Sequence, residues 1–162
     1  MQRARRVVGG TVALVLLVVL VTGPLVGAVD LTRERDPTAG LGQGNATVTV
    51  ESMPERATLA QGDYGADSYY LRVPAAAVRL SNVSERPLLA YAIDVPNLSY
   101  SRTTSHFVSD QSEGRFEVTL QEDTIVASKV QQSSYAAQLR LILRGDAERT
   151  IATRNVTVEV RG

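Results

Sequence analysis

The chain has 162 residues with 17 basic and 17 acidic side chains, so its formal net charge is zero, and it contains no cysteine. The lack of cysteine excludes disulfides, thiolate metal sites and cysteine nucleophiles. The balanced charge offers no basic field for nucleic acid, so no nucleic-acid partner is expected.

The chain begins with an apolar stretch from Val7 to Val29 that contains no charged residue and follows Arg3, Arg5 and Arg6. It is long enough to cross a bilayer core about 30 Å thick, which takes roughly 20 helical residues. The arginines before it predict a cytoplasmic N-terminus and a domain outside the cell. Residues 1–29 are therefore expected to anchor the protein in the membrane through residues 7–29.

A cleaved signal peptide is the alternative interpretation of residues 1–29. The most apolar part, Thr11 to Val21, has the length of a signal-peptide core, and Gly23 and Pro24 then interrupt it. Small residues in Val26-Gly27-Ala28 fit a cut after Ala28, which would release a secreted protein. Both interpretations predict export.

Residues 30–44, "DLTRERDPTAGLGQG", are polar and lack apolar periodicity, which predicts a flexible stalk. A β-domain is expected over residues 45–161, because short alternating apolar segments follow, separated by turn residues. About seven strands are expected, in NATVTVES, SYYLRVP, AVRLSNV, LLAYAIDVP, GRFEVTLQ, YAAQLRLILR and TIATRNVTVEVR. The alternation directs Leu139, Leu141 and Leu143 into the core and Arg140 outward.

With no helix expected between these strands, the pattern predicts an all-β fold, an antiparallel β-sandwich. Tyr135 opens the first strand of the predicted terminal hairpin. It resembles the tyrosine corner of immunoglobulin and fibronectin type III domains, in which the hydroxyl bonds back to the preceding loop. That resemblance implies an Ig-like or fibronectin type III-like sandwich; a plain core tyrosine is the alternative.

The chain's only asparagines all occupy glycosylation sequons: Asn45-Ala46-Thr47, Asn82-Val83-Ser84, Asn97-Leu98-Ser99 and Asn155-Val156-Thr157. An attached glycan is bulky and hydrated, so all four side chains are expected to face solvent. The alternation places Asn45 and Asn155 on the polar faces of their strands. Asn82 and Asn97 are expected in turns at strand ends.

Several other residues with charged or reactive side chains are better explained by structural roles than by functional sites. The tripeptide Arg144-Gly145-Asp146 is expected to form the tip of the terminal hairpin rather than an adhesive motif. His106 is the only histidine, and Ser105 beside it is not a nucleophile elbow, so neither a zinc site nor a catalytic triad is expected. Asp63 and Asp67 lack the spacing of a calcium loop and fit a tight turn.

The tyrosines Tyr69, Tyr70 and Tyr100 are expected to pack in the fold rather than to form a sugar-stacking platform. Alternation along a strand puts Tyr69 and Tyr70 on opposite faces, so at most one of the two could join such a platform.

The chain as a whole resembles haloarchaeal surface proteins. The similarity is carried by the almost purely arginine basic set, the apolar start, the polar stalk, the sequons, and stretches such as "YGADSYYLRVP" and "RPLLAYAIDVPNLSY". The resemblance implies export and transfers no functional residue. We expect a non-enzymatic cell-surface module without a cofactor, structural or adhesive, whose partners are the membrane and envelope proteins or glycans. The alternative is a secreted module that binds a small ligand or glycan.

Overall fold

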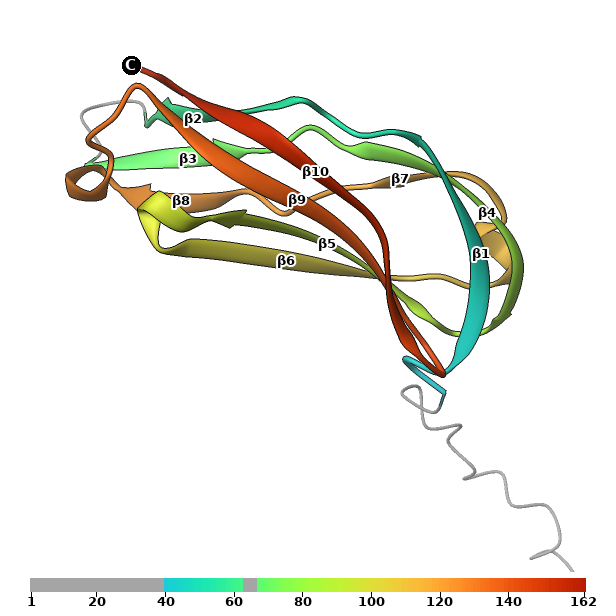
Figure 1. Cartoon of the computed structure of the whole chain (residues 1–162). Helices are drawn as coiled ribbons and strands as arrows, with labels where there is room; N and C mark the ends of the chain where they lie inside the picture. Colours follow the sequence, from blue (N-terminus) through green and yellow to red (C-terminus); the bar gives the residue numbers. More distant parts are fainter. Residues whose placement is uncertain (1–39, 63–66) are drawn as a thin grey trace, which may run out of the picture. The chain divides into compact units, whose positions relative to one another are not determined.

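The computed structural model describes residues 40–62 and 67–162, which form strands joined by short loops and three 3₁₀ turns (Figure 1). The strands are β1 (Gly44–Ser52), β2 (Arg56–Gln61), β3 (Ser68–Arg72), β4 (Ala76–Glu85), β5 (Leu88–Val95), β6 (Tyr100–Phe107), β7 (Gly114–Val118), β8 (Asp123–Val126), β9 (Ser134–Arg144) and β10 (Glu148–Arg161). The turns are η2 (Pro96–Leu98), η3 (Asp110–Ser112) and η4 (Ala127–Lys129). The predicted all-β class is confirmed.

The apolar stretch 7–29 and residues 30–39 of the predicted stalk lie outside the described residues. In the part of the chain that is described, we find no helix with the length and apolar character needed to cross a membrane.

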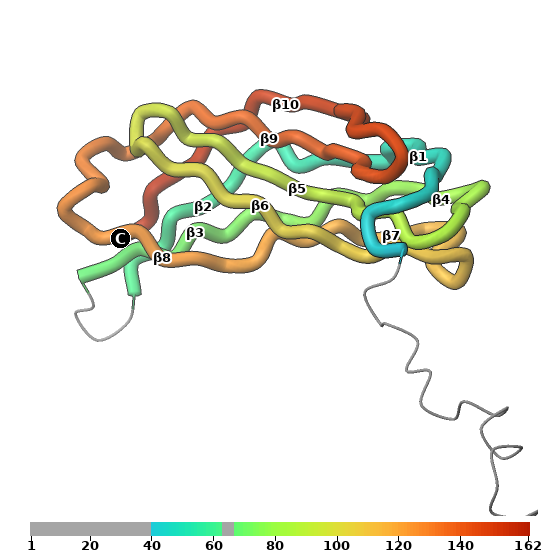
Figure 2. The backbone as a smooth tube through the Cα atoms, turned by 90° about the horizontal axis from the view of Figure 1, so that it is seen from below, coloured from blue at the N-terminus to red at the C-terminus, as the bar shows by residue number. Residues whose placement is uncertain are grey.

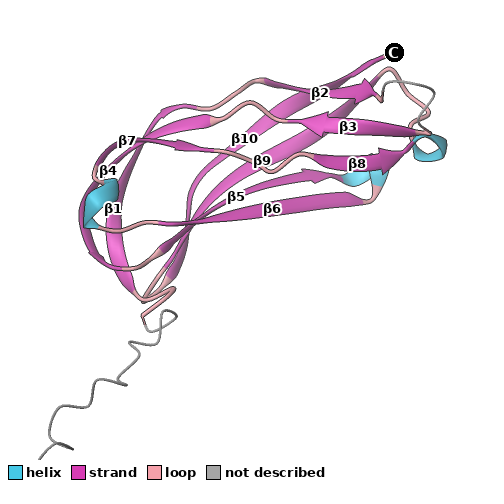
Figure 3. Cartoon of the chain, turned by 180° about the vertical axis from the view of Figure 1, so that it is seen from behind, coloured by secondary structure: helices cyan, strands magenta, loops and turns pink. Residues whose placement is uncertain are grey.

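Two sheets pack together, as expected for a β-sandwich; Figures 1 and 3 show them from opposite sides. One sheet has the order β6-β5-β9-β10-β2-β3-β8 and the other the order β1-β4-β7. Neighbouring strands are antiparallel except β2 and β10, which run parallel with Ala57 opposite Val158. The prediction of a purely antiparallel arrangement was therefore wrong at this one pair.

Breaks in the strands explain how the two sheets connect. β1 and β2 are separated by Met53–Glu55, and β3 and β4 by Val73–Ala75; each break contains a proline, which cannot donate a ladder hydrogen bond. β1 pairs with β4, whereas β2 pairs with β3. The first strand thus crosses over at Pro54 and reaches β10 with its second half.

Three strands were not expected from the sequence: β2, β6 and β8. Ala57 and Ala60 weaken the apolar signal of β2, and β8 has only four residues. In β6, "YSRTTSHF", the alternate residues that turn away from solvent are polar or aromatic rather than aliphatic. The expected strand GRFEVTLQ ends early, at Val118. The backbone groups of Thr119 and Gln121 instead form hydrogen bonds with side chains of β6.

The core lies between the sheets and is filled by side chains from both. Leu139, Leu141 and Leu143 of β9 are fully buried, which confirms their predicted direction, while Arg140 is exposed. They share one cluster with Tyr91 of β5. Further members of this cluster are Leu59, Leu71, Val78, Leu80, Leu89, Ile93, Val95, Val118 and Val158.

The folded unit begins at Gly40, five residues before the expected boundary. Gly42 N donates to Arg86 O at 2.9 Å, and Arg86 N donates to Gln43 O at 3.2 Å. Residues 40–44, assigned to the stalk by composition, are thus tied to the turn after β4. Figure 2 shows this segment and the start of β1 beside the tip of the β9–β10 hairpin.

Candidate functional site

The four sequon asparagines lie on four different elements: Asn45 on β1, Asn82 on β4, Asn97 in η2 and Asn155 on β10. All four are exposed, which confirms that none of them faces the core. A glycan requires this exposure, so the fold permits one at each position. Their glycosylation stays a prediction.

Asn82 is exposed for a different reason from the one expected. It lies inside β4 rather than in the turn beside Pro87. Between Asn45 opposite Ser84 and Thr47 opposite Ser81, the pairing of β1 with β4 shifts its register, which makes a β-bulge. Asn82 has a φ of 51° at this bulge, a left-handed conformation that asparagine tolerates better than most residues.

The bulge brings two sequons together. Asn45 N donates to the Oγ of Ser84 at 3.0 Å, and this hydroxyl donates to Asn45 O at 3.3 Å. In the other direction, Asn82 Nδ2 donates to the Oγ1 of Thr47 at 3.5 Å. The asparagine of each sequon therefore bonds to the hydroxyl residue of the other.

Tyr135 is buried at the start of β9, and its hydroxyl bonds back to the preceding loop. It accepts hydrogen bonds from Gln131 N at 2.7 Å and from Gln132 N at 2.9 Å. These are the contacts expected of a tyrosine corner. They fix the loop between η4 and β9 without any disulfide.

Arg144-Gly145-Asp146 forms the tip of the β9–β10 hairpin, as expected, and its side chains are engaged within the fold. Asp146 Oδ1 accepts a hydrogen bond from Gly44 N at 2.8 Å. Arg144 Nε lies 2.7 Å from Glu148 Oε2. A β-carbon on Gly145 would lie 2.0 Å from Gly44 O, so glycine is required by this close approach. The tripeptide thus holds the hairpin against the start of β1.

His106 takes part in a polar seam, which we define as the contacts between β6 and residues 119–123. Its Nε2 lies 2.8 Å from Thr119 O, and its ring meets Phe116 edge-on, with ring centres 6.0 Å apart. Thr104 Oγ1 accepts from Gln121 N at 2.9 Å. The seam covers the inward-facing side chains of β6 with residues 119–123.

Asp123, at the end of the polar seam, has a pKa below its ordinary value. The main cause is the hydrogen bond from Thr124 N, followed by the bond from the Tyr100 hydroxyl and the nearby positive charge of Arg102. The hydroxyl donates at 2.9 Å, and Arg102 Nη1 lies 3.4 Å away. Burial, together with the neighbouring carboxylate, raises the pKa of Tyr100.

The remaining candidate residues, which are possible metal ligands and sugar-binding tyrosines, are not brought together into a site. Asp63 lies outside the described residues, and the described residues hold no cluster of three or more groups that could ligate a metal. Tyr69 and Tyr100 pack against the core, whereas Tyr70 lies on the other face of β3, opposite Ala60. The expected opposite directions of Tyr69 and Tyr70 are confirmed.

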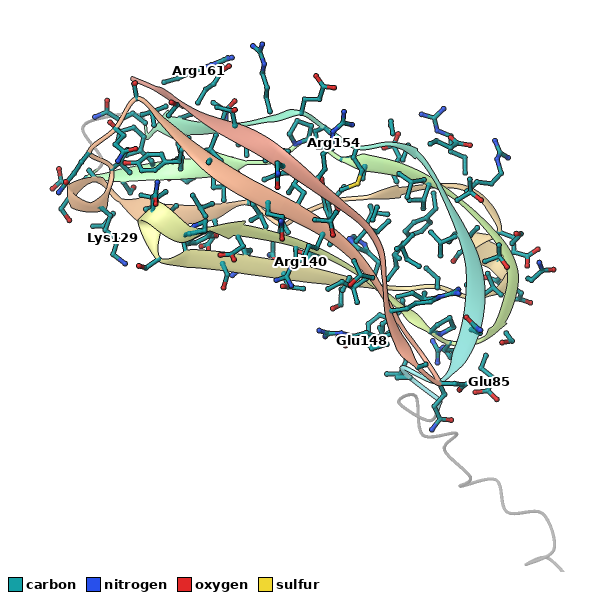
Figure 4. The ribbon with its side chains drawn as sticks, in the orientation of Figure 1. Glu85, Lys129, Arg140, Glu148, Arg154 and Arg161 are labelled. Carbon is teal, nitrogen blue, oxygen red and sulfur yellow. The ribbon has the colours of Figure 1, made fainter. Side chains whose placement is uncertain are left out.

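Two arginines of β10 carry contacts that sequence analysis missed. Arg154, labelled in Figure 4, donates from Nη1 to Met53 O at 2.7 Å, and its Nη2 bonds Glu55 at 2.6 Å. Arg149 Nη2 donates to Ala46 O. These guanidinium groups join β10 to the first strand in the region where no ladder connects them. No local pattern identifies them, because their partners are about one hundred positions away.

Two shallow grooves lie on the outer surface of the larger sheet. One, of about 490 Å³, is lined by Thr58, Ala60, Arg72, Val73, Pro74 and Arg161. The other, of about 330 Å³, is lined by Pro96, Ala136, Ala137, Gln138, Asn155 and Val156. The first contains two arginines, each in contact with a glutamate, and a threonine hydroxyl. The second lies between the η2 turn and the sequon on β10.

Comparison of the chain with models of known protein families and with curated proteins finds no match to either.

Proposed function

We propose that this chain is a non-enzymatic module of the cell surface, with a structural or adhesive role in the envelope. The observation that carries the proposal is that every asparagine of the chain lies in a sequon and every one is exposed. A sequon serves a purpose only in an exported protein, and an exposed asparagine is the condition for its use. The partners we propose are the membrane and envelope proteins or glycans.

We further propose that residues 7–29 anchor the module as a single transmembrane helix, with the N-terminus in the cytoplasm. The support is the uninterrupted apolar sequence and the arginines before it. Gly40 and the C-terminus lie at opposite ends of the folded unit (Figure 1).

The fold within this proposal is an Ig-like or fibronectin type III-like sandwich. Three features support it: the first strand divides between two pairings, its second half runs parallel to the last strand, and Tyr135 bonds back to its preceding loop. In this arrangement the core between the sheets and the loop bonded by Tyr135 connect the strands without any disulfide.

Fractionation of native cells, followed by N-terminal sequencing of the product, tests the proposal. We expect the chain in the membrane fraction with its N-terminal segment retained. A soluble chain that begins near Val29 in the medium would support the secreted alternative. A chain found in the soluble cytoplasmic fraction would refute export altogether.

The second candidate function, binding of a small ligand or glycan, is favoured by the 490 Å³ groove. Arg72 and Arg161 flank the Thr58 hydroxyl there, a set that suits a carboxylate-bearing sugar. Their guanidinium groups also contact Glu122 and Glu159, and these glutamates weaken the positive field of the groove. Titration of the full chain in detergent with an oligosaccharide of glucuronate tests this function. Binding lost in Arg161→Ala and kept in Arg140→Ala would support it, and no saturable binding would exclude it for this sugar class.

A further inference from the structure

The four sequons differ in how tightly the fold holds them. Three lie in strands that pair with neighbours, with Asn82 at a bulge of β4. The fourth, Asn97-Leu98-Ser99, lies in the η2 turn between β5 and β6. A transferase must bind the asparagine together with the hydroxyl residue two positions later, and to do so it must reshape the segment. The local stability of each segment therefore decides whether the folded protein can be modified there.

The sequons of Asn45 and Asn82 are bonded to each other across the pairing of β1 with β4. The Oγ of Ser84 is bonded to both the backbone N–H and the carbonyl of Asn45, and Asn82 Nδ2 is directed to Thr47. Asn45 Oδ1 also accepts from Arg149 Nη2 at 3.2 Å. To present either sequon to an enzyme, the β1–β4 pairing must open.

The sequon of Asn155 is fixed from two sides. Asn155 pairs with Gln138 of β9, and its Oδ1 accepts from Gln138 Nε2 at 3.4 Å. Thr157 pairs with Ala136 on one side and with Arg56 of the parallel strand β2 on the other. This sequon therefore lies in the interior of a sheet, although its side chains face solvent.

The sequon of Asn97 is the exception. One backbone hydrogen bond closes the turn, from Ser99 N to Pro96 O at 2.9 Å. Within the described residues, the side chains of Asn97 and Ser99 make no hydrogen bond, and both residues are exposed. Ser99 has a φ of 48°, in the left-handed region that disfavours serine. Leu98 between them is buried, so the turn keeps its place while its outer residues stay accessible.

We propose that Asn97 is the glycan acceptor of the folded domain, and that Asn45, Asn82 and Asn155 accept a glycan only before their strands form. The donor is an oligosaccharide activated as a lipid-linked phosphate ester. Asn97 Nδ2 forms a bond to the anomeric carbon, and the carbon–oxygen bond to the phosphate breaks with its electron pair leaving on the lipid phosphate. One amide proton passes to solvent. This inference rests on the proposed export, because the donor is used outside the cytoplasm.

The test uses full-length protein made in a host that does not glycosylate and kept in detergent. Folded and urea-denatured samples are incubated with membranes from a host that glycosylates sequons, after dilution to equal urea, and peptide mass spectrometry measures occupancy at each asparagine. We expect folded protein to be modified at Asn97 at least several-fold more than at any other asparagine. Denatured protein should be modified at more than one sequon.

Matched variants test whether modification of the folded protein depends on the Asn97 sequon itself. Ser99→Ala removes the sequon hydroxyl and keeps Asn97, so modification of folded protein should disappear; Ser99→Thr should retain it, and Asn155→Gln should leave it unchanged. Folded protein modified at Asn45, Asn82 or Asn155 as readily as at Asn97 would overturn the inference, as would denatured protein left unmodified at all four sites. The proposed surface location would survive either result, because cell fractionation tests it separately.

Discussion

Asp146 and Gly44 bond to each other twice: Gly44 N donates to Asp146 Oδ1 at 2.8 Å, and Asp146 N donates to Gly44 O at 2.9 Å. The two residues are 102 positions apart in the chain. Through this contact the tip of the last hairpin holds the first residue of the first strand. The Arg-Gly-Asp tripeptide thus has a structural role in this fold.

Asp146→Ala removes the acceptor for Gly44 N and should lower the free energy of unfolding by about 1–2 kcal/mol. Asp146→Asn keeps an acceptor oxygen and should lose less. Urea unfolding of the full chain, followed by circular dichroism, measures both. Equal stability of the alanine variant and the parent would show that the contact contributes nothing.

Gly145→Ala places a β-carbon 2.0 Å from Gly44 O, and that backbone oxygen can move away only if the Asp146–Gly44 contact shifts. Such overpacking should cost about 1–3 kcal/mol. Gly162→Ala is the matched control, because its nearest neighbour would be the Gln61 side chain at 3.7 Å. Thermal unfolding should separate the two variants, and equal melting temperatures would contradict the geometry of the hairpin tip.

Tyr135→Phe leaves the N–H groups of Gln131 and Gln132 without their acceptor, and should cost about 1–3 kcal/mol. Tyr91→Phe should cost less, because the Tyr91 hydroxyl makes only a long bond of 3.5 Å to Pro74 O. Urea unfolding of both variants tests this order. Equal stability of Tyr135→Phe and the parent would mean that the loop before β9 does not depend on the tyrosine hydroxyl.

Leu141→Ala should cost about 2–5 kcal/mol, since Leu141 is fully buried among side chains of both sheets. Arg140→Ala, one residue earlier on the exposed face (Figure 4), should cost less than about 0.5 kcal/mol. Denaturant unfolding measures both changes. Reversed costs would place the strand with the opposite face inward.

Acid should weaken the polar seam. The hydrogen bond from Thr124 N, the Tyr100 hydroxyl and Arg102 lower the pKa of Asp123 from its ordinary value of 3.8. Because the folded pKa is the lower one, this carboxylate stabilises the fold above its ordinary pKa, and the stabilisation disappears as the pH falls through the folded pKa. Asp123→Asn should therefore be less stable than the parent near pH 6. The difference between their free energies of unfolding should become smaller toward pH 3. A gap that stays constant between about pH 6 and pH 3 would show that the charge of Asp123 does not contribute.

Local patterns predicted much of this fold. The alternation of Leu139, Leu141 and Leu143 correctly gave the inner face of β9. For Tyr135 the sequence left a tyrosine corner and a plain core tyrosine as alternatives, and the hydroxyl bonds to the preceding loop as a corner does. The same alternation gave the exposure of Asn45 and Asn155. In a strand with one aliphatic face, the residues of that strand alone are enough to predict which face turns toward the core.

Contacts between distant segments could not be predicted in this way. β6 was missed because its inner face contacts the polar seam. Its inward positions therefore carry polar residues such as Arg102 and Thr104, and the apolar alternation that would predict a strand is absent. The stalk boundary was misplaced because Gly42 is fixed by a backbone bond to Arg86, for which composition gives no signal. Among the sequons, the bulge that holds Asn82 depends on a register that only the paired strands define.

The single lysine, Lys129, allows the most direct test of the surface location. It is exposed in η4, at the end of the folded unit away from Gly40 (Figure 4). Intact native cells are treated with an amine-reactive reagent that cannot cross membranes, and labelled peptides are identified by mass spectrometry, with Lys129→Arg as the control. We predict a label on Lys129 and none on the N-terminal amine until the cells are lysed; a second label on a new N-terminus near Val29 would indicate signal cleavage. Lys129 that reacts only after lysis would contradict the proposed location at the cell surface.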